Sequence, residues 1–222
     1  AAISGRAVDI SCLSGASYPP TIARQVLVSD NDRHVVVFGT NTIGTSTQDP
    51  LLIRWSDSES VTEWTPDTTN TAGSLAINVG SEFLRAIETT TETLVFTDVS
   101  LHSFRYIGAP FVFGQTRIAS NIQLIGPNAV ASTGSITAWM ATGPVFQMYD
   151  GVVHDMPCDI RTYIASILNA EQSEKIYAGV NRQFHEFIWL MPVNGSSENN
   201  FYVICNFDDP ANLIWYYGDF NA

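Results

Sequence analysis

Short apolar runs recur along the chain and alternate with polar turns. The runs are rich in β-branched and aromatic residues and are bounded by Gly, Asn, Asp, Pro or Ser, which is the pattern of β-strands. In order they read RQVLVS, HVVVFGT, LLIRW, FLRAIE, TLVFTD, HSFRY, SITAWM, VFQMYD, GVVHDM, KIYAGV, EFIWLM, FYVICNF and LIWYYG. The pattern predicts an all-β protein.

One segment, residues 158–175, has a different period. Four apolar residues recur there at helical spacing, namely Ile160, Ile164, Ile167 and Leu168. Asp159 precedes them, at the position where a side chain can cap a helix N-terminus. We expect one short connecting helix in this segment.

The strand pairs repeat along the chain. In each repeat an apolar strand ends in an aromatic residue, a turn follows, and a second strand ends near a polar turn. The anchor aromatic residues are Phe38, Phe96, Trp139 and Trp189. Repeats of roughly 40–50 residues with about four strands each are typical of propeller blades. We therefore predict a β-propeller of four to five four-stranded blades, and the spacing leaves open whether these blades complete a ring.

The domain organisation follows from these repeats. Residues 1–50 are predicted to hold a turn-rich N-terminal segment and the first blade strands, and residues 51–222 the remaining blades. The chain begins at Ala1, within a turn-rich segment, from which we expect it to be a piece of a longer protein.

The segment RWSDSESVTEWTPD (54–67) admits two interpretations. It could be a substrate loop with a catalytic carboxylate, or the turn of a repeated β-unit. Ser56 and Asp57 stand where a strand ends and can form turn bonds with the backbone. Trp64 is predicted to fold back as an apolar plug, and Pro66 prevents further strand pairing. These residues favour the structural interpretation.

Charge limits the partners of the chain. Its 22 Asp and Glu residues outnumber nine Arg and one Lys, Lys175, which gives a net charge of −12. Attraction of a nucleic-acid backbone needs clustered cations, so sequence-specific or tight DNA binding is not expected. An acidic wall would instead repel phosphate and let a duplex slide past. We find no apolar stretch of the length that a membrane-spanning helix needs.

No catalytic, cofactor-binding or metal-binding residues are predicted. Cys12, Cys158 and Cys205 are too far apart for a short-spaced metal set, and we expect them to be buried reduced thiols. The four histidines, His34, His102, His154 and His185, lack HxH or HExxH spacing and are expected to be strand-edge side chains. Glu59 and Glu63 share the loop described above, where an exposed structural role is the simpler explanation.

Six ordered segments between Leu51 and Phe220 form a recognisable set. They are RWSD…TEWTPD…NTAGS (Arg54–Ser74), LVFTDVSLHSFRYIGAPFVFG (Leu94–Gly114), IGPNAV (Ile125–Val130), WMATGPVFQMYDGVVHDMPC (Trp139–Cys158), IYAGVNRQFHEFIWL (Ile176–Leu190) and WYYGDF (Trp215–Phe220). In this order they resemble the β-propeller region of tail nozzle proteins of short-tailed bacteriophages, also called tail tubular protein B or packaged-DNA-stabilisation proteins. The resemblance covers about three-quarters of the chain.

The resemblance implies a structural virion protein without enzymatic activity. Such proteins form homo-oligomeric six-fold rings below the portal and adaptor, contact other tail proteins, retain the packaged genome and conduct double-stranded DNA during ejection. The implied location is the virion tail, assembled in the host cytoplasm.

Two other functions stay open at this point. The first is a glycan- or receptor-binding propeller module of a phage or bacterial surface, with Trp55, Trp64, Trp139, Trp189 and Trp215 as stacking surfaces. Their positions in apolar strands favour core roles instead. The second is a glycosidase of sialidase-like fold, which needs an arginine triad and a Tyr/Glu pair; the candidate arginines are Arg54, Arg85, Arg105, Arg117, Arg161 and Arg182.

Overall fold

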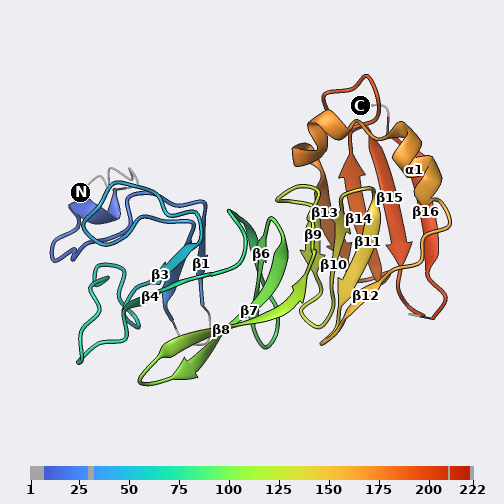
Figure 1. Cartoon of the computed structure of the whole chain (residues 1–222). Helices are drawn as coiled ribbons and strands as arrows, with labels where there is room; N and C mark the ends of the chain where they lie inside the picture. The colour runs from blue at the N-terminus through green and yellow to red at the C-terminus, as the bar shows by residue number, and fades with distance from the viewer. Residues whose placement is uncertain (1–7, 30–32, 210, 221–222) are drawn as a thin grey trace, which may run out of the picture. The chain divides into compact units, whose positions relative to one another are not determined.

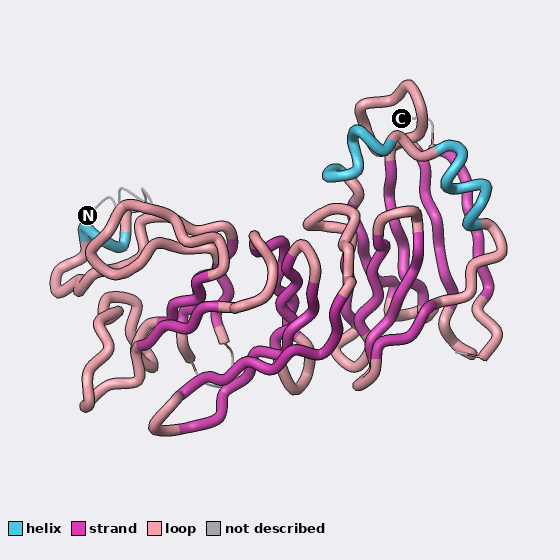
Figure 2. Tube along the Cα trace, viewed as in Figure 1, coloured by secondary structure: helices cyan, strands magenta, loops and turns pink. Residues whose placement is uncertain are grey.

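The computed structural model describes residues 8–29, 33–209 and 211–220, so part of the predicted N-terminal segment, residues 1–7, lies outside the described residues. The described chain contains sixteen strands and three short helices (Figures 1 and 2), which confirms the all-β prediction. No helix in these ranges is long and apolar enough to cross a bilayer.

The strands are β1 (Gln25–Val28), β2 (Val35–Phe38), β3 (Leu52–Trp55), β4 (Gly73–Ala76), β5 (Phe83–Glu88), β6 (Thr93–Thr97), β7 (Ser100–Gly108), β8 (Val112–Ser120), β9 (Val130–Ser132), β10 (Thr137–Ala141), β11 (Val145–Tyr149), β12 (Val153–Asp155), β13 (Tyr177–Asn181), β14 (Glu186–Met191), β15 (Phe201–Asn206) and β16 (Ile214–Asp219). The helices are η1 (Ile10–Cys12), α1 (Arg161–Ile167) and η2 (Ala170–Lys175).

The strands form four antiparallel sheets of four strands each. The sheets contain β1 to β4, β5 to β8, β9 to β12 and β13 to β16, and we call them the first to the fourth sheet. Within each sheet the neighbours follow sequence order, so every sheet is an up-and-down meander. The predicted repeat of four-stranded units is therefore confirmed for four units.

The anchor aromatic residues occupy equivalent positions in the four sheets. Phe38, Phe96, Trp139 and Trp189 lie on β2, β6, β10 and β14, the second strand of each sheet, and each is 0% exposed. Burial of one such side chain contributes roughly 1.5–3 kcal/mol. The regular spacing of these four aromatic residues in the sequence therefore corresponds to one core position that is repeated in each sheet.

Each anchor contacts an aromatic ring from a neighbouring sheet. Phe96 of the second sheet meets Trp139 of the third edge-to-face at 5.3 Å. Trp189 of the fourth sheet meets Phe146 of the third at 4.8 Å, also edge-to-face. The Trp189 indole nitrogen also donates a hydrogen bond of 3.1 Å to the carbonyl of Ala129, just before β9. Edge-to-face contacts add to the stability gained from burial alone, so these rings lock adjacent sheets together.

The chain divides into two compact units. The first unit comprises residues 1–83 and 106–115, and the second comprises residues 84–105 and 116–222. In the first unit, Phe38 stacks on Phe83 at 5.1 Å, and Trp55 meets Phe113, near the tip of the β7–β8 hairpin, at 5.1 Å. In the second unit, the anchors of the second, third and fourth sheets share one apolar cluster.

In the first and the fourth sheet, a glycine on the last strand lies beneath an aromatic ring of the neighbouring strand, which leaves no room for a larger side chain. Gly73 pairs with Trp55 across β3 and β4, and a Cβ at Gly73 would lie 2.5 Å from the indole. Gly218 pairs with Tyr202 across β15 and β16, and a Cβ there would lie 2.6 Å from the phenol oxygen. An aromatic ring lying over a cross-strand glycine shields the backbone and fixes the register.

Several local predictions need correction. The Asp150-Gly151 sequence is typical of a two-residue hairpin turn, but the loop between β11 and β12 has three residues, Asp150 to Val152, because Tyr149 pairs with Val153. The predicted helix is confirmed only as α1, which ends at Ile167, and Leu168 and Asn169 are extended before η2 begins. The residue at the N-cap is Ile160, with no side-chain capping bond, so Asp159 does not cap the helix.

Candidate functional site

The segment 54–67 is a structural turn, as its residues predicted. Trp64 is only 1% exposed, and its indole nitrogen donates to the carbonyl of Val61 at 2.9 Å. The Ser56 hydroxyl accepts the backbone N–H of Val35 at 3.0 Å and donates to the Asp57 carbonyl at 2.9 Å. Ser56 and the Trp64 indole nitrogen therefore help to close the loop, and the Trp64 ring is buried beneath it.

Asp57 is held by Thr71. Its carboxylate accepts the Thr71 backbone N–H at 2.8 Å and the Thr71 hydroxyl at 2.5 Å. Burial raises the pKa of Asp57, but the two Thr71 hydrogen bonds outweigh burial and lower that pKa below its ordinary value of 3.8. An acid with a lowered pKa is ionised at neutral pH and cannot act as a proton donor.

Arg54 lies in the core of the first unit. It is 1% exposed, and its two terminal nitrogens donate to the carbonyls of Tyr18 at 2.6 Å and Asn41 at 3.3 Å. Burial lowers the pKa of the guanidinium. Arg54 thus ties the N-terminal segment to the loop after β2, and it is inaccessible to a substrate.

The loop carboxylates do not form an acid–base pair. Glu59 is exposed and forms an ion pair with Arg33. Glu63 accepts the Thr65 backbone N–H at 3.0 Å. Both carboxylates therefore serve local structure.

The histidines occupy unrelated environments. His154 lies on the edge strand β12, as predicted, 3.3 Å from Asp150. His102 instead lies on the inner strand β7, fully buried, with Nε2 2.8 Å from the Ser100 hydroxyl. No cluster of three or more His, Cys, Asp or Glu side chains suited to a metal ion occurs in the described part of the chain.

The three cysteines are free thiols. Cys205 is buried and Cys158 is half-buried, whereas Cys12 is exposed, so the prediction of a buried thiol is wrong for Cys12. Burial raises the pKa of Cys158 to about 11 and that of Cys205 to about 12. A raised pKa suppresses the thiolate, which is the reactive form.

One Tyr/Glu pair links the second and third sheets. The Tyr149 hydroxyl donates to the Glu92 carboxylate at 2.9 Å, and the Ser103 hydroxyl also contacts that carboxylate. Burial, followed by the Glu92 hydrogen bond and charge, raises the pKa of Tyr149 to about 12. A phenol that resists ionisation is a poor nucleophile, so this pair serves to join the sheets.

The tryptophans separate into two groups. Trp55, Trp64, Trp139 and Trp189 are buried, in line with their predicted core roles. Trp215 on β16 is half-exposed and lines a pocket of about 290 Å³. We call this the Trp215 pocket; its lining residues are Pro157, Asp159, Ala211, Asn212, Leu213 and Trp215.

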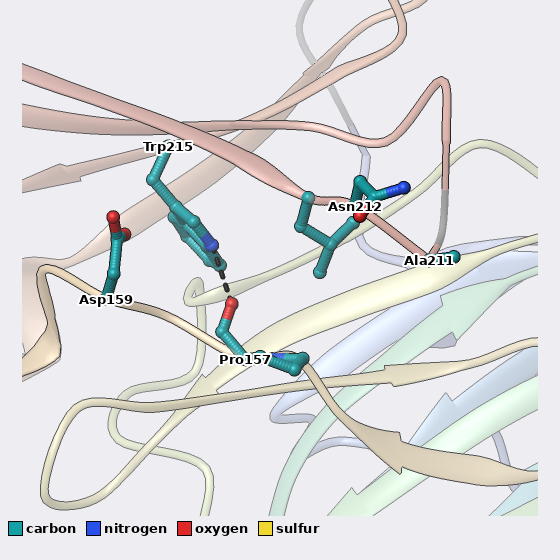
Figure 3. Close-up of a pocket in the computed structure, with 6 residues that line it drawn as sticks. Pro157, Asp159, Ala211, Asn212 and Trp215 are labelled. Atoms are coloured by element: carbon teal, nitrogen blue, oxygen red, sulfur yellow. Dashed lines mark hydrogen bonds between the residues drawn. The ribbon is translucent and has the colours of Figure 1, made fainter.

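The indole in this pocket is fixed in place. Its nitrogen donates to the Pro157 carbonyl at 2.8 Å, and Asp159 and Asn212 lie on either side of the ring (Figure 3). The Asn212 amide nitrogen donates to Asp209 at 2.7 Å, which leaves the Asn212 oxygen as an acceptor. The Asp159 carboxylate, predicted to be a helix cap, instead lines this pocket.

A second hollow lies at the other end of β16, with a volume of about 400 Å³. We call it the Tyr217 cleft; its lining includes Tyr163, Asn200, Phe201, Tyr217, Asp219 and Phe220. Tyr163 of α1 meets Tyr217 at 5.0 Å, with the rings tilted by 46°. Tyr217 also stacks on Phe201 at 5.9 Å. The cleft therefore lies between the helix and the last two strands of the fourth sheet.

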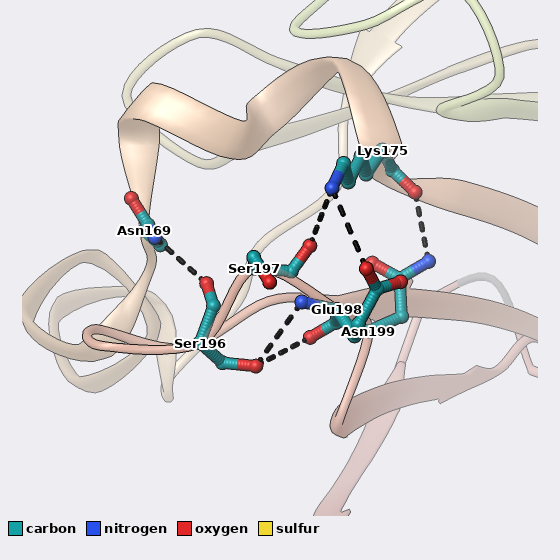
Figure 4. A network of polar contacts seen from close by, with 6 residues as sticks. All are labelled: Asn169, Lys175, Ser196, Ser197, Glu198 and Asn199. Carbon is teal, nitrogen blue, oxygen red and sulfur yellow. Dashed lines mark hydrogen bonds and ion pairs between the residues drawn. The ribbon is translucent and has the colours of Figure 1, made fainter.

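The wall of the cleft is a loop, residues 192–200, that is fastened to the helical connection. Lys175 donates to the Ser197 carbonyl at 2.6 Å and lies 3.6 Å from Glu198 (Figure 4). The Asn199 amide donates back to the Lys175 carbonyl at 2.7 Å. Asn169 donates to the carbonyl of Ser196 at 2.8 Å. The loop is thereby held against η2 at three points.

Sequence reasoning missed this cleft. Its residues come from a helix, a loop and two strands that are distant in the sequence. The one local signal is WYY at Trp215–Tyr217, where three large aromatic residues succeed one another on a strand, so that rings point to both faces.

No protein-family model and no curated protein matches the chain. Among solved structures it is similar to the N-terminal domain of Nup159, with 10% sequence identity and a TM-score of 0.35. The match covers 92% of this chain and 63% of that structure, so this chain spans less than two thirds of its length. Similarity at this level identifies neither a family nor a function.

Proposed function

We propose that this chain is the β-propeller part of a tail nozzle protein of a short-tailed bacteriophage. In this proposal the sheets are propeller blades, and the protein has no catalytic activity of its own. It assembles as a six-fold ring beneath the portal and adaptor, retains the packaged genome and conducts double-stranded DNA during ejection from the virion.

The observation that carries the proposal is the succession of four meander sheets with one buried aromatic anchor each. In the second unit, Trp139 and Trp189 join their sheets to the preceding ones through Phe96 and Phe146. Stacked sheets that share packed side chains resist deformation, because protein interiors are close-packed and only slightly compressible. Such rigidity suits a mechanical component of a tail.

The use of basic side chains also supports the proposal. Arg24 and Arg33 pair with Glu82 and Glu59. The Arg161 guanidinium donates to the Gly143 carbonyl at 3.1 Å, and Arg54 is buried. With a net charge of −12 and four of its nine arginines engaged in this way, the chain offers little attraction to DNA phosphates. That property suits the wall of a channel through which a duplex moves.

Assembly tests the proposal directly. Mass photometry of the purified protein, with negative-stain images of the particles, is expected to show rings of six subunits around an axial channel. A protein that stays monomeric at micromolar concentration, or that forms rings of another order, would overturn it.

A DNA-binding measurement tests the proposed channel wall. In a mobility-shift assay at 150 mM salt we expect no retention of a random-sequence duplex, because an acidic surface lacks the cations that release counterions on binding. Sequence-specific retention of one duplex would contradict a passive channel wall.

A further inference from the structure

The Trp215 pocket and the Tyr217 cleft lie along one face of β16. Residues two apart on a strand point to the same side of the sheet, so the Trp215 and Tyr217 rings face the same way. Tyr216, between them, points to the other side. Both sides are open to solvent at this edge strand, since Tyr217 is 48% exposed and Tyr216 is 51% exposed.

The polar groups of the two hollows specify the ligand. Asp159 and the Asn212 oxygen offer acceptors in the Trp215 pocket, and Asp219 offers a carboxylate in the Tyr217 cleft. The Asn200 oxygen accepts the Val193 N–H at 3.1 Å, which turns its amide nitrogen toward other partners as a donor. A matching ligand therefore has groups that both donate and accept hydrogen bonds.

The charge of the hollows excludes other ligand classes. No Lys, Arg or His is among the described residues that line them, while Asp159 and Asp219 are present, so an anionic ligand would be repelled. A purely cationic ligand would leave the Asn200 donor without an acceptor, and an aliphatic one would bury the carboxylates unpaired. Hydroxyl groups combined with apolar C–H faces, as found in neutral sugars, satisfy both the polar groups and the rings.

The site is also held rigidly before any ligand arrives. The Trp215 indole is fixed by Pro157, and the loop that carries Asn200 is fastened to η2 through Lys175, Asn169 and Asn199. Groups that are already ordered lose little conformational entropy on binding. Pockets of this kind combine aromatic walls with a few fixed polar groups.

From this arrangement we propose that the face of β16 carrying Trp215 and Tyr217 binds a neutral oligosaccharide. One sugar ring stacks on Trp215, and a further ring occupies the Tyr217 cleft between Tyr163 and Tyr217. The Asp159, Asn212, Asn200 and Asp219 side chains bind the hydroxyl groups. This activity is separate from the proposed role in the tail.

Isothermal titration with maltohexaose, cellohexaose and chitohexaose tests the proposal, with quenching of tryptophan fluorescence as a second readout. Saturable binding of at least one of them is expected, with a dissociation constant on the order of 0.1 mM. If none of the three saturates at millimolar concentration, or if choline binds and none of them does, the proposal is overturned.

Two adjacent substitutions supply the matched control. Tyr217→Ala is expected to weaken saccharide binding about tenfold, and Tyr216→Ala, with nearly the same exposure on the opposite face, to change it less than about twofold. Equal weakening by both variants would overturn the assignment to this face. Circular dichroism confirms that each variant is folded, and Trp215→Phe, which keeps an aromatic ring, is expected to bind more tightly than Trp215→Ala.

A substitution that removes one negative charge distinguishes a neutral ligand from a cationic one. Asp219→Asn keeps an oxygen acceptor for a hydroxyl group, so we expect binding to weaken only severalfold. Complete loss with this variant alone would indicate a cationic ligand and would contradict a neutral one. Ring assembly is measured separately, so failure of sugar binding leaves the proposed tail role unaffected.

Discussion

The first and the fourth sheet have the same topology but are stabilised differently. In and around the first sheet, five buried side chains are polar, namely His34, Thr40, Asn41, Arg54 and Ser56. In the described residues of β13 to β16 the buried side chains are apolar, and three of the seven are aromatic rings. The first sheet, which also buries Phe38 and Trp55, therefore adds hydrogen-bonded polar side chains to its apolar core, whereas the fourth relies on apolar packing.

The difference shows how one repeat tolerates two kinds of core. Buried hydrogen bonds specify a single arrangement, because each unpaired group would cost about 1–3 kcal/mol. Ring packing tolerates more variation and gains its energy from buried area. The first sheet should accordingly be sensitive to pH and to loss of single polar atoms, and the fourth to loss of side-chain volume.

The largest effect is expected from Trp189→Ala in the fourth sheet. This change removes the contacts with Phe146 and Trp215 and leaves the Ala129 carbonyl with the Met140 N–H as its remaining donor. We expect a loss of about 4–5 kcal/mol in unfolding free energy, measured by urea unfolding and by hydrogen exchange of the β14 amides. As a control, Tyr216→Ala should change stability by no more than about 0.5 kcal/mol. A loss of unfolding free energy below about 1 kcal/mol for Trp189→Ala would contradict the view that the fourth sheet relies on ring packing.

Trp64→Ala is the corresponding test in the first unit. It should cost about 3–4 kcal/mol, somewhat less because Trp64 lies in a loop that can partly close over the space. Phe111, which is 73% exposed, is a matched aromatic control, and Phe111→Ala should be close to neutral. If the two variants lose similar stability, Trp64 does not fill the core as described.

Acid should weaken the first unit through Asp57. Because the pKa of this carboxyl is lowered in the folded state, its contribution is fully present above the ordinary value of 3.8 and disappears as the pH falls below it. Between pH 5 and pH 3, about 1 kcal/mol or less of stability should be lost through this group. Hydrogen exchange in β2 and β3 of the wild type, compared with Asp57→Asn, measures it; an equal acid response in both would contradict the assignment.

The smallest effect concerns the thiols. Reaction with a chromogenic disulfide at pH 8 should label Cys12 rapidly. Cys158 and Cys205 should react slowly, because burial raises their pKa values and limits access. Rapid labelling of Cys205 in the native protein would mean that the core of the fourth sheet opens readily, and Cys12→Ser removes the fast phase as a control.

Much of the fold could be predicted from the sequence, because apolar alternation and turn residues are local signals. The thirteen apolar runs all lie on strands, and the four anchors fall on equivalent strands. The missed strands are β4, β8 and β9. β4 is GSLA and β9 is VAS, in which small residues give no pattern, and pairing with a neighbour alone makes them strands. β8 continues its hairpin with polar residues.

The candidate site was mostly beyond prediction. A core role was favoured for Trp215 over a stacking surface, yet it is half-exposed. Tyr163 and Asn200 join the cleft only through the packing of α1 and of a loop against the fourth sheet. Asp159 shows where prediction from the sequence fails. Its position before a helical pattern predicted a helix cap. In the structure the helix begins two residues later and the carboxylate faces the Trp215 pocket.

The single lysine of the chain has a practical consequence. Lys175 anchors the wall of the Tyr217 cleft through Ser197 and Glu198. Amine-reactive dyes, cross-linkers and biosensor coatings modify lysine side chains, and the one lysine side chain that they would modify in this sequence is that anchor. Immobilisation through the exposed thiol of Cys12 would leave the loop intact. The choice of attachment chemistry therefore decides whether a ligand screen probes the native cleft.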